Sequence, residues 1–232
     1  MNTEFEAIFG EPPRELADVS AAPAQYSPLH PGALCIEEAA PGSLGNLAML
    51  APPGTVERRY AIALALRALR EGAPLLAMAP KDKGGSRLAG DLADLGCAVE
   101  ETSRRHHRIC LARAPGDAGA IEAAIAAGAP QRVEPLGLWS QPGVFSWNRL
   151  DPGTALLMES LPRLKGRGAD FGCGIGMLSR AALANPDVTQ LAMIDMDRRA
   201  IDAARRNITD ARAKFLWRMR ANGTRRSLIS SS

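Results

Sequence analysis

The stretch Asp170-Phe171-Gly172-Cys173-Gly174-Ile175-Gly176 decides the fold expected for this chain. Its alternating glycines let the backbone approach a bulky ligand, because a side chain there would block the approach or forbid a positive φ. The preceding residues 168–171 fit a short buried strand, and residues 177–183 fit a helix. A strand, a glycine turn and a helix in this order predict a nucleotide-cofactor loop in an α/β fold.

A second carboxylate follows the loop at the end of another apolar run. Residues 190–195 fit a strand that ends in Asp195, and the next helix is expected over residues 198–207, with Ile201 and Ala204 on its apolar side. A carboxylate at the tip of a second strand is a suitable acceptor for a ribose diol. The two segments together predict a site for a cofactor that contains a nucleoside.

The glycine spacing separates two classes of cofactor. A dinucleotide fingerprint, G-x-G-x-x-G, would need its third glycine where Met177 or Ser179 stands, so a dehydrogenase is disfavoured. An acidic residue, G-x-G-x-G and a downstream aspartate are similar to motifs I and II of class I S-adenosylmethionine-dependent methyltransferases. The alternative is a glycine turn that serves packing alone.

The segment before the loop narrows the resemblance. Residues 142–157, with the sequence PGVFSWNRLDPGTALL, resemble the signature before motif I in the bacterial 16S ribosomal RNA guanine-N2 methyltransferases known as small-subunit methyltransferase C and in their 23S relatives. The resemblance implies that five of these residues lie beside the cofactor: Phe145, Ser146, Asp151, Gly153 and Thr154. The start of a helix, with Asp151 as N-cap and Pro152 at the first helical position, is an alternative explanation for part of the same segment. The two explanations are compatible.

The resemblance implies a cofactor, a reaction and a partner. The cofactor is S-adenosylmethionine, the reaction is methyl transfer to the exocyclic N2 of a guanine in small-subunit ribosomal RNA, and the partner is ribosomal RNA or the small ribosomal subunit. Asp170 and the glycines would surround the methionine moiety, and Asp195 would bind the ribose. The full set of cofactor-binding residues implied is Asp170, Phe171, Gly172, Cys173, Gly174, Gly176, Asp195, Met196, Asp151 and Thr154.

The first half of the chain has an α/β rhythm but no acidic G-x-G-x-G, which predicts a parallel or mixed sheet. Strands are expected at 47–50, 75–79, 97–99 and 109–113, and helices at 56–69, 86–95 and 117–127. The family resemblance implies an α/β protein in which a degenerate methyltransferase-like domain precedes an incomplete Rossmann-like class I methyltransferase domain. The expected boundaries are 1–128 for the first domain, 129–143 for a linker and 144–232 for a C-terminally truncated second domain.

Two basic segments are candidates for RNA contact, in a chain whose formal net charge is +3. The turn at residues 80–87 lacks the P-loop order, but a helix N-terminus beside Lys81 and Lys83 can bind a phosphate. The alternative is a solvated turn with Ser86 as N-cap. Residues 104–108, Arg-Arg-His-His-Arg, are the best local candidate, and the alternative is an exposed turn between two edge strands.

Other chemistries lack support. The four cysteines are widely separated without C-x-x-C, and three histidines give no metal-ligand spacing, so no metal is expected. Ser146 and Ser179 lack a G-x-S-x-G setting, which disfavours serine hydrolysis. The absence of a signal peptide or a long apolar run predicts a cytoplasmic protein without a membrane partner.

The sequence does not contain the tetrapeptide Asn-Pro-Pro-aromatic, which orients the target amine in amino-methylating members of the superfamily. Residues 185–187, Asn-Pro-Asp, fit a turn instead. We therefore expect impaired activity and weak binding of S-adenosylmethionine, and the alternative is a non-catalytic module that binds RNA or protein. The sequence after Trp217 fits either a basic tail of a kind that can bind RNA or the product of a shifted reading frame.

Overall fold

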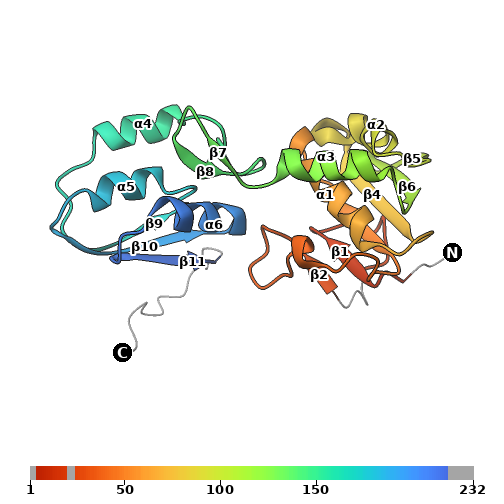
Figure 1. Ribbon diagram of the computed structural model, residues 1–232, viewed down its shortest axis with the longest axis horizontal. Coiled ribbons are helices and arrows are strands. Elements are labelled where there is room, and N and C mark those ends of the chain that lie inside the picture. Colours follow the sequence, from red (N-terminus) through yellow and green to blue (C-terminus); the bar gives the residue numbers. More distant parts are fainter. Residues whose placement is uncertain (1–3, 20–23, 219–232) are drawn as a thin grey trace.

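The computed structural model describes residues 4–19 and 24–218, arranged in two lobes that each contain a β-sheet (Figure 1). We name residues 4–128 the N-terminal lobe and residues 129–218 the C-terminal lobe. No helix in the described part of the chain is long and apolar enough to cross a membrane. The basic tail and the shifted reading frame concern residues that, apart from Arg218, lie outside the described ranges.

The N-terminal lobe contains a six-stranded mixed sheet, as the alternating pattern predicted. The first four strands in this sheet are parallel, β6 pairs antiparallel with β4, and β5 pairs antiparallel with β6. In spatial order the strands are β2 (Ala24–Tyr26), β1 (Ala7–Phe9), β3 (Leu47–Leu50), β4 (Pro74–Pro80), β6 (His107–Arg113) and β5 (Glu100–Arg104).

Three helices pack on one face of this sheet: α1 (Thr55–Ala68), α2 (Ser86–Asp94) and α3 (Ala118–Gly128). They share one apolar core with the strand residues of that face, including Leu47, Leu75 and Cys110. The helix α1 packs tightly on α3. Gly128 of α3 lies so close to Tyr60 of α1 that a Cβ atom at this glycine would collide with the Tyr60 side chain. Two short helical turns, η1 (Ile36–Glu38) and η2 (Lys81–Gly85), complete the lobe.

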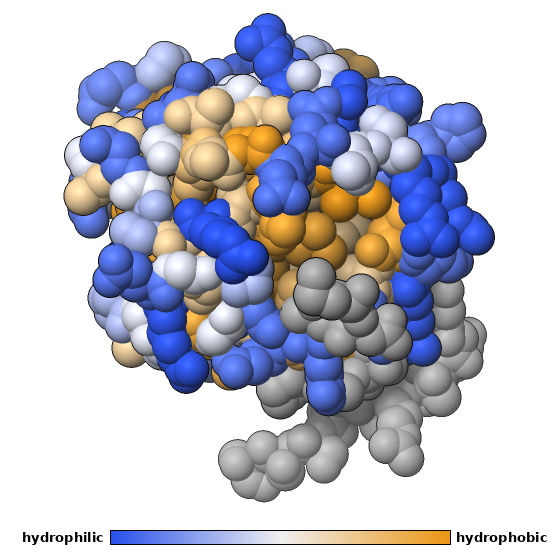
Figure 2. Space-filling view, turned by 90° about the vertical axis from the view of Figure 1, so that its right-hand side faces the viewer, coloured by the Kyte–Doolittle hydropathy of each residue, from blue (hydrophilic) through white to orange (hydrophobic). Residues whose placement is uncertain are grey.

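On the opposite face of the same sheet the described residues form no helix, and the chain near the N-terminus covers it. Phe5 and Ala17 pack there on Ala48 and Met78. A cavity of about 580 Å³ beside them is lined by apolar side chains and by three arginines. Figure 2, which faces this end of the molecule, shows apolar surface in a hollow bordered by hydrophilic residues.

The C-terminal lobe contains three parallel strands in the order β11 (Ala213–Trp217), β10 (Val188–Asp195) and β9 (Gly166–Phe171). Its helices are α4 (Pro152–Glu159), α5 (Met177–Leu183) and α6 (Arg198–Asn207). The predicted helices at 177–183 and 198–207 are confirmed, and Ile201 and Ala204 are buried as expected. Among the described residues β9 pairs only with β10, and α4 has no buried side chain.

Two local predictions are wrong, and the expected linker has secondary structure of its own. Residues 97–99 are not a strand, because the Cys97 amide bonds the Leu92 carbonyl at 3.1 Å to close the end of α2, and pairing with β6 starts at Glu100. Ser86 is the first residue of α2, and Gly85 occupies the N-cap position. The expected linker contains an antiparallel hairpin of β7 (Gln131–Val133) and β8 (Leu138–Ser140).

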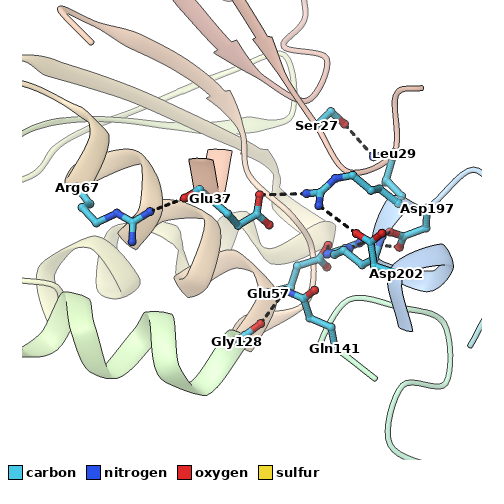
Figure 3. A network of polar contacts seen from close by, with 11 residues as sticks. Ser27, Leu29, Glu37, Glu57, Arg67, Gly128, Gln141, Asp197 and Asp202 are labelled. Atoms are coloured by element: carbon cyan, nitrogen blue, oxygen red, sulfur yellow. Dashed lines mark hydrogen bonds and ion pairs between the residues drawn. The ribbon is translucent and has the colours of Figure 1, made fainter. Parts of the chain in front are cut away.

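Ion pairs from the first turn of α6 join the two lobes (Figure 3). Arg198 Nη2 lies 3.0 Å from Glu37 Oε2, and Arg199 Nη1 lies 2.6 Å from Glu57 Oε1. Backbone contact accompanies these pairs, since the Arg198 amide bonds the Pro28 carbonyl at 2.8 Å. The start of α6 is therefore fixed against the N-terminal lobe.

Replacing Asp91 by alanine should strongly destabilise the N-terminal lobe. Arg58 is fully buried and its Nε lies 2.6 Å from Asp91 Oδ2, so the variant leaves a buried cation without its carboxylate. We expect the free energy of unfolding, measured by urea denaturation, to fall by about 3–5 kcal/mol. The control is Asp94→Ala, whose partner Arg59 is partly exposed, with an expected loss of about 1 kcal/mol or less. Equal losses in the two variants would contradict this assignment.

Candidate active site

Two glycines of the loop face open space. Gly172 has φ 75° and Gly174 has φ 54°, and no heavy atom lies within 4 Å of a Cβ built on either residue. Bonds to β10 hold the loop, because the Gly172 and Cys173 amides donate to the Ile194 carbonyl at 2.8 and 3.1 Å. A ligand can therefore approach the backbone at both glycines.

Gly176 has a different role. It precedes α5 with φ 92°, and a Cβ there would lie 2.8 Å from Ile208 Cδ1 and 3.1 Å from Met193 Cε. The missing side chain makes room for the apolar core rather than for a ligand. Of the three predicted loop glycines, two are open to a ligand and one is a packing residue.

The carboxylate of Asp170 is bonded inside the loop. Ser179 Oγ, at the start of α5, donates to Asp170 Oδ2 at 2.6 Å. Burial raises the pKa of Asp170, the Ser179 bond opposes this effect, and the charge of Asp195 adds to it. Ser179 was not predicted as a site residue, although its place in the first turn after the glycine loop is a signal that could have identified it.

Asp195 joins the two predicted motifs. Its Oδ2 accepts from the Gly174 amide at 2.9 Å, and its Oδ1 accepts from the Asp197 amide at 2.9 Å. Each carboxylate oxygen has a further lone pair, so the group can still accept hydrogen bonds from a ligand. The structure thus brings the predicted ribose acceptor directly onto the glycine loop.

A further residue that the sequence analysis missed anchors the loop from behind. Asn207, the last residue of α6, bonds both the amide and the carbonyl of Trp139, at 2.7 and 2.9 Å. Its Nδ2 also donates to the Ile175 carbonyl at 2.9 Å. One side chain therefore connects the β7–β8 hairpin to the glycine loop. No motif in the sequence marks an asparagine at a helix end for this role.

The segment before α4 lies beside the loop. The N-cap prediction for Asp151 is confirmed, since its Oδ2 accepts from the Thr154 amide at 2.9 Å, and Pro152 is at the start of the helix. A cavity of about 220 Å³ connects this segment to the loop. Seven predicted cofactor residues line it: Asp151, Thr154, Asp170, Phe171, Gly172, Cys173 and Gly174. Phe145 and Ser146 also line it, whereas Gly153, Gly176, Asp195 and Met196 do not.

The cavity is small for a cofactor. Pockets for ligands of this kind span about 300–1,000 Å³, so the described residues form one wall of such a site. The open glycines and the carboxylates at this wall fit a cofactor with a ribose and a cationic centre. Cys173 remains a neutral thiol, because burial and the nearby carboxylates of Asp195 and Asp170 raise its pKa.

The basic segments lie away from this cavity. Arg105 and His106, with φ 47° and 60°, form the exposed turn between β5 and β6, of which only β5 is at the edge of the sheet. Lys81 and Lys83 lie in η2, also in the N-terminal lobe. RNA contact at either place stays a prediction. In the described ranges, no cluster of three or more histidine, cysteine or acidic side chains could hold a metal ion.

Comparisons with known proteins find similarity to methyltransferases. Residues 135–227 match the model of the methyltransferase small domain. The chain is 34% identical over 175 residues to ribosomal RNA small subunit methyltransferase C of Stutzerimonas stutzeri strain A1501, covering 73% of this chain and 52% of that protein. It is 31% identical over 186 residues to the protein of the same name from Pseudomonas paraeruginosa, covering 78% and 56%.

The chain is similar to members of the ribosomal RNA small subunit methyltransferase C family. It spans about half the length of these relatives. The solved structure of the T. thermophilus 16S rRNA N2 G1207 methyltransferase, in complex with AdoMet and guanosine, matches with a TM-score of 0.68 and 19% identity. That match covers 91% of this chain and 64% of the other, and it confirms the Rossmann-like methyltransferase fold.

Alanine substitutions should separate the two kinds of glycine in this loop. All three positions have positive φ, so each substitution introduces backbone strain of about 1–2 kcal/mol. Gly176→Ala also overpacks the core, which adds about 1–3 kcal/mol. We expect urea denaturation to give a lower free energy of unfolding for Gly176→Ala than for Gly172→Ala or Gly174→Ala. Equal losses at the three positions would refute the distinction.

Asp170→Asn should stabilise the protein at neutral pH. A carboxyl whose pKa is raised on folding contributes stability below its unfolded pKa, and this contribution is lost as the pH rises through the folded pKa. The amide stays neutral and its oxygen still accepts from Ser179. We expect the variant to unfold at higher urea concentration at pH 7, with the difference shrinking in acid. Asp187→Asn, at an exposed ion pair, is the control. A less stable Asp170→Asn protein at pH 7 would contradict the argument.

Proposed function

We propose that this chain provides the cofactor-binding part of an RNA methyltransferase, which transfers a methyl group from S-adenosylmethionine to the exocyclic N2 of a guanine in small-subunit ribosomal RNA. The observation that carries the proposal is the bond between Asp195 and the Gly174 amide, beside two glycines that are open to a ligand. Similarity to the methyltransferase C proteins supports the same reaction. We further propose that the protein acts in the cytoplasm on ribosomal RNA or the small ribosomal subunit.

The chain's own residues would bind and orient the cofactor. Gly172 and Gly174 admit its methionine part, Asp195 accepts hydrogen bonds from the ribose, and Asp170 holds the turn through Ser179. The bound cofactor supplies an electrophilic methyl group on a sulfonium. Gly176 has no direct role in this proposal, because its missing side chain makes room for the apolar core, and the proposal assigns no role to Met196 or Gly153.

We also propose the domain division that the sequence indicated. Two observations support a degenerate methyltransferase-like domain over residues 1–128. The six-stranded sheet supports a methyltransferase-like fold, and the lack of an acidic G-x-G-x-G in this part of the sequence supports the loss of the cofactor loop. Residues 129–143 connect it to the methyltransferase domain over 144–232 and carry the β7–β8 hairpin. The N-terminal domain would position the catalytic half through the ion pairs of Arg198 and Arg199.

A second candidate function is a non-catalytic module that binds RNA. It is favoured by the absence of the Asn-Pro-Pro-aromatic tetrapeptide from the sequence, because orienting the target amine requires acceptors of that kind. Methyl transfer from labelled S-adenosylmethionine to 30S ribosomal particles distinguishes the two candidates. Label in the ribosomal RNA supports the enzyme, and RNA binding without label supports the module.

The chain alone should bind S-adenosylmethionine weakly. The described residues form a cavity of about 220 Å³, so much of a bound cofactor would stay in water. We expect isothermal titration calorimetry to give a dissociation constant of about 1 mM or weaker. The control titrates Gly174→Ala, whose added methyl group projects into the open space and should remove any measurable heat. Micromolar binding by the unmodified chain would refute this expectation.

A further inference from the structure

A groove separate from the cofactor cavity lies where the two lobes meet. Its volume is about 510 Å³. One side is formed by α6, including Arg198, Arg205 and Arg206, and the other by Tyr60 and the segment Trp139 to Gln141. Gln141 reaches across this junction, with its Nε2 donating to the Gly128 carbonyl at 2.9 Å. We call this feature the interlobe groove.

Two arginines at the groove have no carboxylate partner among the described residues. The guanidinium of Arg206 lies 5.0 Å from the ring centroid of Trp139, and that of Arg205 lies 5.8 Å from the ring centroid of Phe215. Both side chains are exposed. The carboxylates nearby, Glu37 and Asp202, already pair with Arg198. The groove thus presents positive charge that the described residues do not neutralise.

Two buried donors also line the groove without a partner. Ser140 is fully buried and its Oγ makes no hydrogen bond in the described structure, and the same holds for the buried Nε of Arg198. An unsatisfied buried donor is costly, so a ligand with acceptor oxygens would be stabilised there. Charge and unpaired donors, which are independent observations, both indicate an anionic oxygen ligand.

We propose that the interlobe groove binds backbone phosphates of RNA next to the cofactor site. Arg205 and Arg206 would contact the phosphates from the rim, and Ser140 Oγ and Arg198 Nε would donate from the floor. Guanidinium groups match phosphate oxygens in geometry, and a stacked guanidinium stays oriented. Arg198 and Arg205 are separated by about 10 Å along α6, which leaves room for more than one phosphate. This inference rests on the RNA partner of the proposed function.

The groove is physically close to the cofactor cavity. Gln141 lines the groove and Phe145 lines the cavity, and the four peptide units between them span at most about 15 Å. Trp139, in the groove, is connected to Ile175 of the glycine loop through Asn207. RNA held in the groove would therefore pass the cofactor site within a few nucleotides.

The test measures RNA affinity by fluorescence anisotropy with the full chain and a labelled single-stranded RNA of about twelve nucleotides, the size of an ordinary single-strand site. For Arg205→Gln/Arg206→Gln we expect about tenfold weaker binding at about 0.1 M salt. The slope of log affinity against log salt should fall by about 1.4, because each single-strand phosphate contact contributes about 0.7. Ser140→Ala should weaken binding about threefold without lowering the urea midpoint, since no bond within the protein is lost.

The matched control is Arg104→Gln/Arg105→Gln, which removes two charges from the β5–β6 turn, the competing RNA candidate. Unchanged affinity in this control supports the groove. An equal loss in both double variants, or no loss in the groove variant, overturns the proposal while the proposed function stands. Absence of RNA binding by the unmodified chain overturns both. Equal binding of an acidic peptide of similar charge would overturn RNA as the occupant. Calorimetry with S-adenosylmethionine tests the cofactor site separately.

Discussion

The arrangement of both lobes depends on the buried guanidinium of Arg199. Cations at a helix N-terminus are opposed by the helix dipole, yet α6 begins with two arginines. Burial by itself lowers the pKa of Arg199, but bonds and charges from Asp197 and Glu57 outweigh it and keep the group ionised. Asp197 caps the helix and Glu57 comes from the other lobe. The carboxylate of Glu57, from the other lobe, therefore helps to offset the unfavourable interaction between the Arg199 cation and the dipole of α6.

The position of α6 then determines the geometry of the cofactor loop. The first turn of the helix is fixed by Arg199, and its last residue, Asn207, bonds Trp139 and Ile175. A rigid helix between these ends transmits the orientation of the N-terminal lobe to the glycine loop. This connection gives the N-terminal lobe a physical role in the site although it contributes no residue to the cavity.

Local pattern was enough to predict the glycine loop, its flanking elements and the mixed sheet, because these depend on residues close in sequence. The contacts that assemble the site were not predictable in this way. Glu57 and Arg199 are 142 positions apart, and nothing in either neighbourhood marks them as partners. The β7–β8 hairpin was assigned to a linker, since three-residue strands are too short to show alternation. Whether such short strands form depends on the partner strand that they pair with, rather than on the β-propensity of their own residues.

Asp195 shows why a cofactor site can be partly formed without its ligand. Its two oxygens hold the Gly174 and Asp197 amides, so the carboxylate that would accept a ribose also fixes the turn that would admit the rest of the cofactor. Such preorganisation lowers the entropic cost of binding. The apolar lining of the cavity differs, because Phe145 is 80% exposed and Phe171 61% exposed. Since hydrophobic contact contributes only where water is excluded, this wall can orient a cofactor far better than it can retain one.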